Sequence, residues 1–295
     1  MAGMDAALQA HLEGGLTTVC HAWKITRKDG VCFAFTDHDL PLTFEDVEFR
    51  ADAGLSARAI AQTTGLSVDN TEAIGALSDA AIREDEIEQG RFDDAEVQAW
   101  LVNWADVSQR WLQFRGTIGE ITRADGTFRA ELRGLTEALN RTLGRVYQKP
   151  CTAVLGDAQC RFDTSQPGFS ITLEVDMEED GRTFSWESLA GFDDAFFIRG
   201  RMDVLTGPAT GLFGLIKHDR VRGGRRVIEL WEPIKADVSQ GTQVRLLAGC
   251  NKKMETCRVK FDNLLNYQGF PDLPGEDWVI AVPKSTSANT GGSRR

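Results

Sequence analysis

The sequence predicts a mostly β (α+β) fold, in which two β-barrel or sandwich-like domains are accompanied by a few short helices. Short runs rich in branched and aromatic residues recur along the chain, and Gly, Asp and Pro separate them. Only short segments show the periodicity of an amphipathic helix. The chain has 295 residues, which is long enough for two domains with separate cores.

The N-terminal domain is expected over residues 1–146 and begins with a helix and a hairpin. Residues 5–14 form a short amphipathic pattern that ends at two glycines. The two runs that follow are rich in β-forming residues and flank a typical turn. They are Thr17–Thr26 and Val31–Thr36, joined by Lys28-Asp29-Gly30.

The rest of this domain is expected to combine three further strands with short helices. An Ala-Asp-Gly turn at 124–126 marks a second hairpin. The acidic run Glu84-Asp85-Glu86 indicates a solvated helix face. In chain order the expected elements are irregular β structure over 45–65, a helix over Ser78–Gln89, strands over Ala95–Trp104, Trp111–Ile121 and Phe128–Arg133, and a helix over Leu135–Leu143.

The C-terminal domain is expected over residues 147–283, after a boundary marked by Pro150. A first cysteine loop spans about 147–163, and a β unit of about 168–247 follows it. Turn residues occupy every gap between the strands of this unit, as in a small antiparallel barrel or sandwich. The expected strands are Phe169–Met177, Thr183–Glu187, Phe196–Val204, Gly211–His218 and Val227–Pro233. A second cysteine loop and Val259–Leu265 close the unit, and residues 284–295 are expected to form a flexible tail.

The composition limits the function classes. The formal charge of −11 disfavours a nucleic-acid binder, because an acidic protein gains nothing from neutralising phosphates. It suits the wall of a channel through which DNA slides, although solubility alone also accounts for it. No apolar run is long enough for a transmembrane helix, and the N-terminus lacks the pattern of a secretion signal. We therefore expect synthesis in the bacterial cytoplasm, where thiols stay reduced, and no stable membrane insertion.

Two pairs of cysteines form the candidate site: Cys151 with Cys160, and Cys250 with Cys257. Four thiolates from two loops suit a tetrahedral sulfur site. The spacing fits zinc poorly, because eight and six residues separate the paired cysteines, whereas zinc loops favour roughly two to four. An iron–sulfur cluster tolerates wider spacing. Zinc is the second choice of metal, and two disulfides or unbound thiols remain alternatives.

Such a site has a physical purpose in this chain. About ninety residues separate Cys160 from Cys250, so bringing the two loops together opposes folding by roughly 4 kcal/mol of loop-closure entropy. A four-thiolate centre would offset that cost and clamp both ends of the β unit. An apolar core could serve the same purpose, so the sequence does not require the centre.

Several motifs in order resemble one protein family. They are Phe35-Thr-Asp-His-Asp39, the run Leu143-Gly-Arg-Val-Tyr147, Leu155-Gly-Asp157 between the first two cysteines of the candidate site, the pair Cys250 and Cys257, and Asn266-Tyr-Gln-Gly-Phe-Pro271 followed by Pro274-Gly-Glu-Asp277. The chain is similar, from about residue 15 to 283, to the baseplate hub proteins of long-tailed phages and gene transfer agents. The minor tail protein L of phage lambda is a distant relative, similar mainly in the C-terminal cysteine region.

The resemblance implies a structural function. It implies a homotrimer in the tail baseplate of a released particle, between a distal tail protein ring above and a tail fibre or tip protein below. The trimer would contribute to the channel for DNA delivery. It also implies that Cys151, Cys160, Cys250 and Cys257 hold an iron–sulfur cluster, of the [4Fe-4S] type, as a structural staple.

The alternative function is a tail-associated, cysteine-dependent cell-wall peptidase. Cys20 and His21 are adjacent on a strand and face opposite ways, so they cannot form a nucleophile–base pair with each other. Cys20 with His38 across the hairpin is a geometrically possible pair. No oxyanion donors are evident, so we expect no enzyme. Cys20 and Cys32 are interpreted as small apolar core residues. Asp37-His38-Asp39 is interpreted as a polar motif that fixes a turn or a subunit contact.

Overall fold

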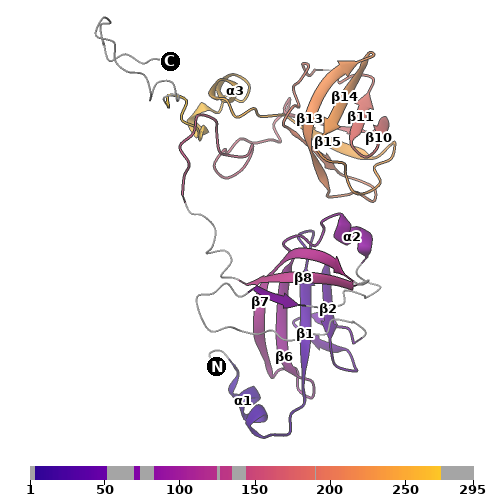
Figure 1. Cartoon of the computed structure of the whole chain (residues 1–295), viewed down its shortest axis with the longest axis vertical. Coiled ribbons are helices and arrows are strands. Elements are labelled where there is room, and N and C mark those ends of the chain that lie inside the picture. Colours follow the sequence, from indigo (N-terminus) through magenta and orange to yellow (C-terminus); the bar gives the residue numbers. More distant parts are fainter. Residues whose placement is uncertain are drawn as a thin grey trace, which may run out of the picture. The chain divides into compact units, whose positions relative to one another are not determined.

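The computed structural model describes residues 4–51, 70–73, 83–124, 127–134, 144–189 and 191–273. The chain divides into two compact units, Met1–Leu143 and Gly144–Arg295 (Figure 1). The predicted fold class is confirmed: the structure is mostly β with few short helices, and its sheets include a curled half-barrel. The expected helix over 135–143 and the tail over 284–295 lie outside the described residues.

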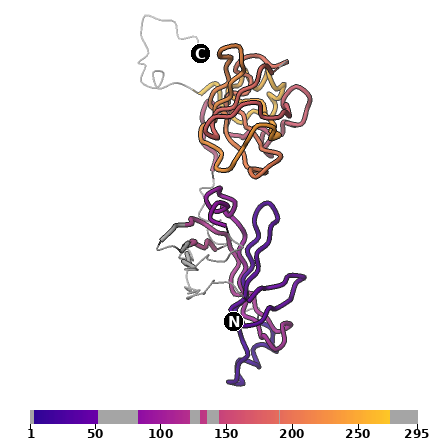
Figure 2. Tube along the Cα trace, turned by 90° about the vertical axis from the view of Figure 1, so that its right-hand side faces the viewer, coloured from indigo at the N-terminus to yellow at the C-terminus, as the bar shows by residue number. Residues whose placement is uncertain are grey.

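The first unit contains a six-stranded antiparallel sheet in the order β2-β1-β6-β7-β8-β5. The hairpins expected from sequence are part of it, and Figure 2 shows the β1–β2 hairpin in indigo. Its strands are β1 (Val19–Thr26), β2 (Cys32–Thr36), β5 (Asn70–Ala73), β6 (Glu96–Asn103), β7 (Arg110–Ala124) and β8 (Thr127–Gly134). The smaller elements are α1 (Ala6–Glu13), β3 (Leu42–Phe44), β4 (Val47–Phe49) and α2 (Glu84–Glu88).

This sheet has an apolar core on each face. Along β1, Cys20 and Ala22 belong to one core, while Trp23 and Ile25 belong to the other. Alternate residues of a strand point to opposite faces, so both faces of the sheet are covered. On one face the hairpin of β3 and β4 packs aromatic rings against Trp100 of β6. The N-terminal half of the expected helix over Ser78–Gln89, and most of 45–65, lie outside the described residues.

The two cysteines of this unit have different environments. Cys20 is buried, as the sequence predicts. Cys32 is exposed, so its interpretation as a core residue is wrong. It is the first residue of β2, which is an edge strand, and it pairs there with Thr26. The β1–β2 turn closes as expected, with Arg27 N–H donating to Val31 O and with Gly30 at a φ of 86°.

The second unit contains a seven-stranded antiparallel sheet in the order β10-β11-β14-β13-β12-β15-β9. Its core consists of inward-facing side chains, among them the fully buried Phe184, Met202 and Ile228. The strands are β9 (Ser170–Glu174), β10 (Met177–Glu179), β11 (Thr183–Trp186), β12 (Arg201–Val204), β13 (Phe213–Arg222), β14 (Arg225–Leu230) and β15 (Gln243–Leu247). After the sheet come the helix α3 (Met254–Val259) and the 3-10 turn η2 (Leu264–Asn266).

The expected strand over Phe196–Val204 is wrong in its first half. Only Arg201–Val204 is a strand, and turns precede it, with Ala195 and Arg199 in the left-handed region. The N–H of Phe197 donates to the buried carboxylate of Asp219 instead of to a neighbouring strand. This side-chain acceptor lies elsewhere in the fold, and a local sequence pattern cannot reveal it.

Two further differences concern β9, β10 and β15. The expected strand over Phe169–Met177 is divided into β9 and β10, which lie on opposite edges of the sheet. β15 is absent from the strands expected from sequence, yet it pairs with both β12 and β9. No helix among the described residues is long and apolar enough to cross a membrane.

Candidate functional site

The four candidate cysteines lie on loops and a helix next to the second sheet. Cys151 and Cys160 are in the loop that precedes β9. Cys250 lies three residues after the end of β15, and Cys257 is on α3. In Figure 1 α3 lies beside the sheet, next to the segment that leads into β9. Because β9 and β15 are paired neighbours, the loop before β9 and the loop after β15 begin at the same edge of the sheet.

Asp157 shapes the first cysteine loop. Its carboxylate accepts hydrogen bonds from the backbone N–H groups of Val154 (2.8 Å), Gln159 (2.9 Å) and Cys160 (2.6 Å). Burial acts to raise the pKa of this carboxyl, but these hydrogen bonds and the nearby Lys252 charge outweigh burial and hold the pKa below its usual value. The ionised side chain thus fixes the backbone on which Cys160 sits.

Backbone and side-chain contacts join the first loop to the second. The N–H of Cys151 donates to Lys252 O at 2.9 Å, and the Lys252 ammonium donates to Ala153 O. The Tyr267 hydroxyl lies within hydrogen-bond distance of Lys149 O (2.7 Å) and Lys252 O (3.2 Å). Tyr267 therefore bridges the two cysteine loops.

Asn263 connects Cys160 of the first loop to Cys257 on α3. Its side-chain amide donates to Cys160 O at 2.7 Å and to Cys160 Sγ at 3.6 Å. Its backbone carbonyl accepts from Cys257 Sγ at 3.2 Å, and its own N–H donates to Cys257 O at 3.0 Å. Asn266 in turn donates to the Asn263 side-chain oxygen at 2.7 Å. Sequence reasoning missed Asn263, because it is 103 residues from Cys160 and no local motif marks it.

The electrostatics show that the four thiols share one region. Burial first, and then the charges of Cys151, Cys160 and Cys250, together raise the pKa of Cys257 to about 11. Burial, followed by the charges of Cys151, Cys257 and Cys250, also raises the pKa of Tyr267. All six cysteines are free thiols. The described residues include no group of three or more His, Cys, Asp or Glu side chains placed to hold a single metal ion.

The surroundings of the thiols fit an iron–sulfur cluster. Phe162 and Phe261 are buried, with ring centroids 5.0 Å apart, and they pack against Cys160 and Cys250. An amide N–H points at Cys160 Sγ, and hydrogen bonds to sulfur tune such clusters. Reduced thiols, an apolar shell and a donor to sulfur are the chemical features that this group needs.

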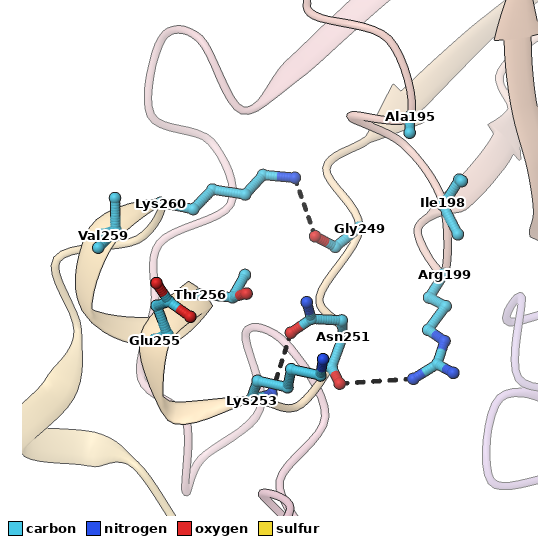
Figure 3. A pocket seen from close by; sticks show the side chains of 10 residues that line it. All are labelled: Ala195, Ile198, Arg199, Gly249, Asn251, Lys253, Glu255, Thr256, Val259 and Lys260. Carbon is cyan, nitrogen blue, oxygen red and sulfur yellow. Dashed lines mark hydrogen bonds between the residues drawn. The ribbon is translucent and has the colours of Figure 1, made fainter.

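A pocket of about 610 Å³ lies beside the second cysteine loop (Figure 3). Lys260 donates to Gly249 O at 3.0 Å and to Phe196 O at 2.7 Å, while Arg199 donates to Asn251 O at 3.4 Å. Burial lowers the pKa of Lys260 to about 8, against the opposing attraction of Cys250 and Asp219. The side chains of Lys260 and Arg199 in this pocket therefore connect the turn before β12 to the loop after β15.

In the described part of the chain, Cys20 and His38 of the alternative peptidase site bind different partners and share no hydrogen bond. Cys20 Sγ lies 3.6 Å from Val102 O and 3.8 Å from Thr36 Oγ1, and burial is the largest cause that raises its pKa. His38 stacks on Trp104, with ring centroids 5.1 Å apart, and its Nδ1 accepts from Leu40 N–H. A buried thiol with a raised pKa is a poor nucleophile.

The Asp37-His38-Asp39 motif fixes a turn, as predicted. These residues follow β2 in a bend rather than on a strand. Asp37 accepts from the backbone N–H of His21 at 2.6 Å, and its other oxygen lies 3.0 Å from His21 Nδ1. The carboxylate thereby ties the end of β2 to β1.

Comparisons with known proteins support the resemblance seen in the sequence. The family described as "Baseplate hub protein, N-terminal attachment domain" matches residues 5–163, which is more than half of the chain. A second family, described as "Phage conserved hypothetical protein BR0599", matches residues 195–277. No curated protein matches the chain.

A solved structure is similar over nearly the whole length. It is a chain of the "Virion of native gene transfer agent (GTA) particle", with 47% sequence identity and a TM-score of 0.90. The similarity covers 98% of this chain and 99% of that one. The chain therefore belongs to the baseplate hub protein family and is a structural component of the baseplate in a phage-like tail or gene transfer agent particle.

Proposed function

We propose that this hub protein uses an iron–sulfur cluster, of the [4Fe-4S] type, as a structural staple. Its ligands are Cys151, Cys160, Cys250 and Cys257. The observation that supports the proposal most is that hydrogen bonds bring the cysteine loops together, since Asn263 links Cys160 to Cys257 and Cys151 N–H meets Lys252 O. Thiolates repel one another when they are brought together without a cation, and bound iron would turn this repulsion into attraction.

The position of the loops supports a stapling role. The seven-stranded sheet runs from Ser170 to Leu247, with one cysteine loop before it and the other after it. When bound, the cluster supplies metal–thiolate bonds to both loops. The protein supplies the rest: Asp157 orders the first loop, Asn263 orients Cys160, and Phe162 and Phe261 exclude water.

Anaerobic purification of the full chain tests this proposal. We expect a brown protein with broad visible absorption and near-stoichiometric iron and sulfide. Replacing any one ligand by Ser should remove the colour, whereas the matched variants Cys20→Ser and Cys32→Ser should keep it. One zinc per chain would keep the site and change its metal. Metal-free protein that retains free thiols, or that contains disulfides, would overturn the cluster.

We also infer that the hub is a homotrimer, with a distal tail protein ring above it and a tail fibre or tip protein below it. The resemblance to hub proteins supports this arrangement. In it the hub contributes to the channel for DNA delivery, and a formal charge of −11 suits a surface to which DNA does not stick. Native mass spectrometry of the purified hub protein should give the mass of a complex of three chains. A protein that stays monomeric at all concentrations would contradict the trimer.

The channel proposal has its own test. We expect no measurable binding of double-stranded DNA at physiological salt, because the chain has 44 acidic and 33 basic side chains. An electrophoretic mobility assay measures this. Tight, salt-dependent DNA binding would contradict a channel wall that only guides DNA.

A further inference from the structure

The outer face of the second sheet carries an exposed apolar patch. Its members are Phe213 (57% exposed), Leu215 (55%) and Trp231 (58%). Phe213 and Leu215 are two residues apart on β13 and therefore share a face. The N–H of Trp231 donates to Leu215 O at 2.9 Å, which places Trp231 directly beside them. Large apolar side chains gathered on one exposed surface mark an interaction site.

Basic side chains surround this patch in excess over acidic ones. Asp203 pairs with both Arg201 and Arg245, at 2.7 and 2.9 Å. Glu229 pairs with three cations, which are Lys217 at 3.2 Å, Arg182 at 3.3 Å and Arg220 at 3.6 Å. Five cations thus share two carboxylates.

Two of these cations also contact the exposed rings. The Arg201 guanidinium lies 5.2 Å from the Phe213 ring centroid, and the Lys217 ammonium lies 5.5 Å from the Trp231 ring. The apolar centre and the cationic rim are therefore one continuous surface. It fits a partner that offers both apolar groups and an excess of carboxylates.

The charge of this chain is unevenly divided between its units. Residues 1–143 contain 13 basic and 24 acidic residues, so this unit carries a net charge of −11. Residues 144–295 contain 20 of each and are neutral. The whole formal charge of the protein therefore belongs to its N-terminal unit, which is complementary to the cationic rim of the patch.

We propose that the patch formed by Phe213, Leu215 and Trp231 binds the acidic N-terminal unit of a second copy of this chain. The proposal rests on the homotrimer proposed above and names the surfaces that join its copies. Contact between unlike surfaces is a heterologous interface, which closes into a ring when the rotation between copies is right. The apolar centre supplies contact area, and the charges set the orientation of the partner.

Photo-crosslinking of the full chain tests the occupant. A photoreactive amino acid replaces Trp231, and in a second variant it replaces Met177, which is 56% exposed on the edge strand β10 of the same sheet. Labelled and unlabelled copies are mixed, so that mass spectrometry separates crosslinks between copies from those within one copy. We expect Trp231 crosslinks to residues 1–143 of the other copy, and none from the Met177 position.

The same crosslinks should form in assembled particles. Crosslinks from position 231 to a different baseplate protein, to the C-terminal unit, or only within one copy would overturn the proposal. These outcomes leave the hub function intact, because the variant chain would still be found in the particle. Failure to enter particles, with normal folding, would instead count against the hub function.

A second variant tests the energetics. Leu215→Asp should weaken self-association by at least about tenfold, because it buries a carboxylate at the centre of an apolar contact. Sedimentation equilibrium measures the change. Met177→Asp is the matched control, since it makes the same substitution at an equally exposed position. Equal self-association of both variants and the wild type would contradict the proposed surface.

Discussion

At the residue scale, the cysteine centre depends on an asparagine that belongs to neither cysteine pair. Asn263 contacts Cys160 through its side chain and Cys257 through its backbone. It also directs an N–H at Cys160 Sγ. Asn263 therefore links the first cysteine loop to α3, and its N–H group stabilises negative charge on the sulfur of Cys160.

Asn263→Ala should lower the free energy of unfolding by about 1–3 kcal/mol, because Cys160 O loses its donor. In iron-loaded protein, we expect the reduction potential to fall as the N–H to sulfur disappears. Chemical denaturation and electrochemistry measure the two effects. Asn266→Ala is the control, since it keeps both bonds to Cys160. Identical behaviour of the two variants would show that Asn263 has no special role.

The His21–Asp37 pair makes stability depend on pH. Its hydrogen bond to Asp37 is the largest cause that raises the pKa of His21, against the effect of burial. The pair therefore stabilises the fold below the unfolded-state pKa of His, about 6.5, and this contribution is lost as pH rises through the higher folded-state pKa. Both side chains are more than one third exposed, so the effect should stay below about 1 kcal/mol.

Asp37→Asn tests this sign. The variant should be less stable than the wild type at mildly acidic pH, and the difference should shrink as pH rises past neutrality. Urea unfolding across this range gives the measurement, with Asp39→Asn as the neighbouring control. A difference that grows with pH would mean that the ion pair is not the source.

At the element scale, a buried ion pair organises the turn before β12. Arg226 on β14 donates to both carboxylate oxygens of Asp219 on β13, and the same carboxylate accepts from Phe197 N–H. Arg226 also donates to Phe192 O and Asp193 O. These bonds explain why the segment forms turns where its sequence predicts a strand.

Asp219→Ala should destabilise the second unit by about 3–5 kcal/mol, because it leaves the Arg226 guanidinium buried without its main partner. Asp85→Ala removes an exposed pair on α2 and should change stability by less than about 1 kcal/mol. Thermal unfolding of the two variants gives the comparison. If Asp219→Ala were also nearly neutral, the pair would not organise this turn.

The sequence predicts some elements well and others poorly, for a physical reason. The strands β1, β2, β7 and β8 meet at local turns whose residues require a hairpin, so the chain itself encodes their pairing. β15 pairs instead with β12, about forty residues earlier, and with the more distant β9. Such pairing depends on the folded core and leaves only a short apolar run in the sequence.

At the scale of the whole molecule, sequence identifies the four candidate cysteines but not the contacts that hold their loops together. The thiols are conspicuous because their residue type is rare and chemically distinctive. Lys252 and Tyr267 act through long-range contacts between ordinary polar groups. Those contacts exist only after the chain has folded, and no spacing rule predicts them.

Removal of iron tests whether one group clamps both loops. If the proposed cluster is present, its loss should increase amide hydrogen exchange in residues 147–163 and 250–267 to the same extent and at the same rate. Residues 19–36 of the first unit should not change. Hydrogen exchange before and after anaerobic chelation measures this, with chelator-treated Cys151→Ser protein as the control. Loosening of only one loop would contradict a shared clamp.

The contact between the two cysteine loops also has an evolutionary consequence. Because Cys151 N–H meets Lys252 O, the chain enters and leaves the seven-stranded sheet at nearly the same point. A segment with adjacent ends can be exchanged, enlarged or permuted without moving its attachment point. Away from the patch formed by Phe213, Leu215 and Trp231, the sheet between the loops is therefore able to diversify without moving its attachment to the cysteine loops.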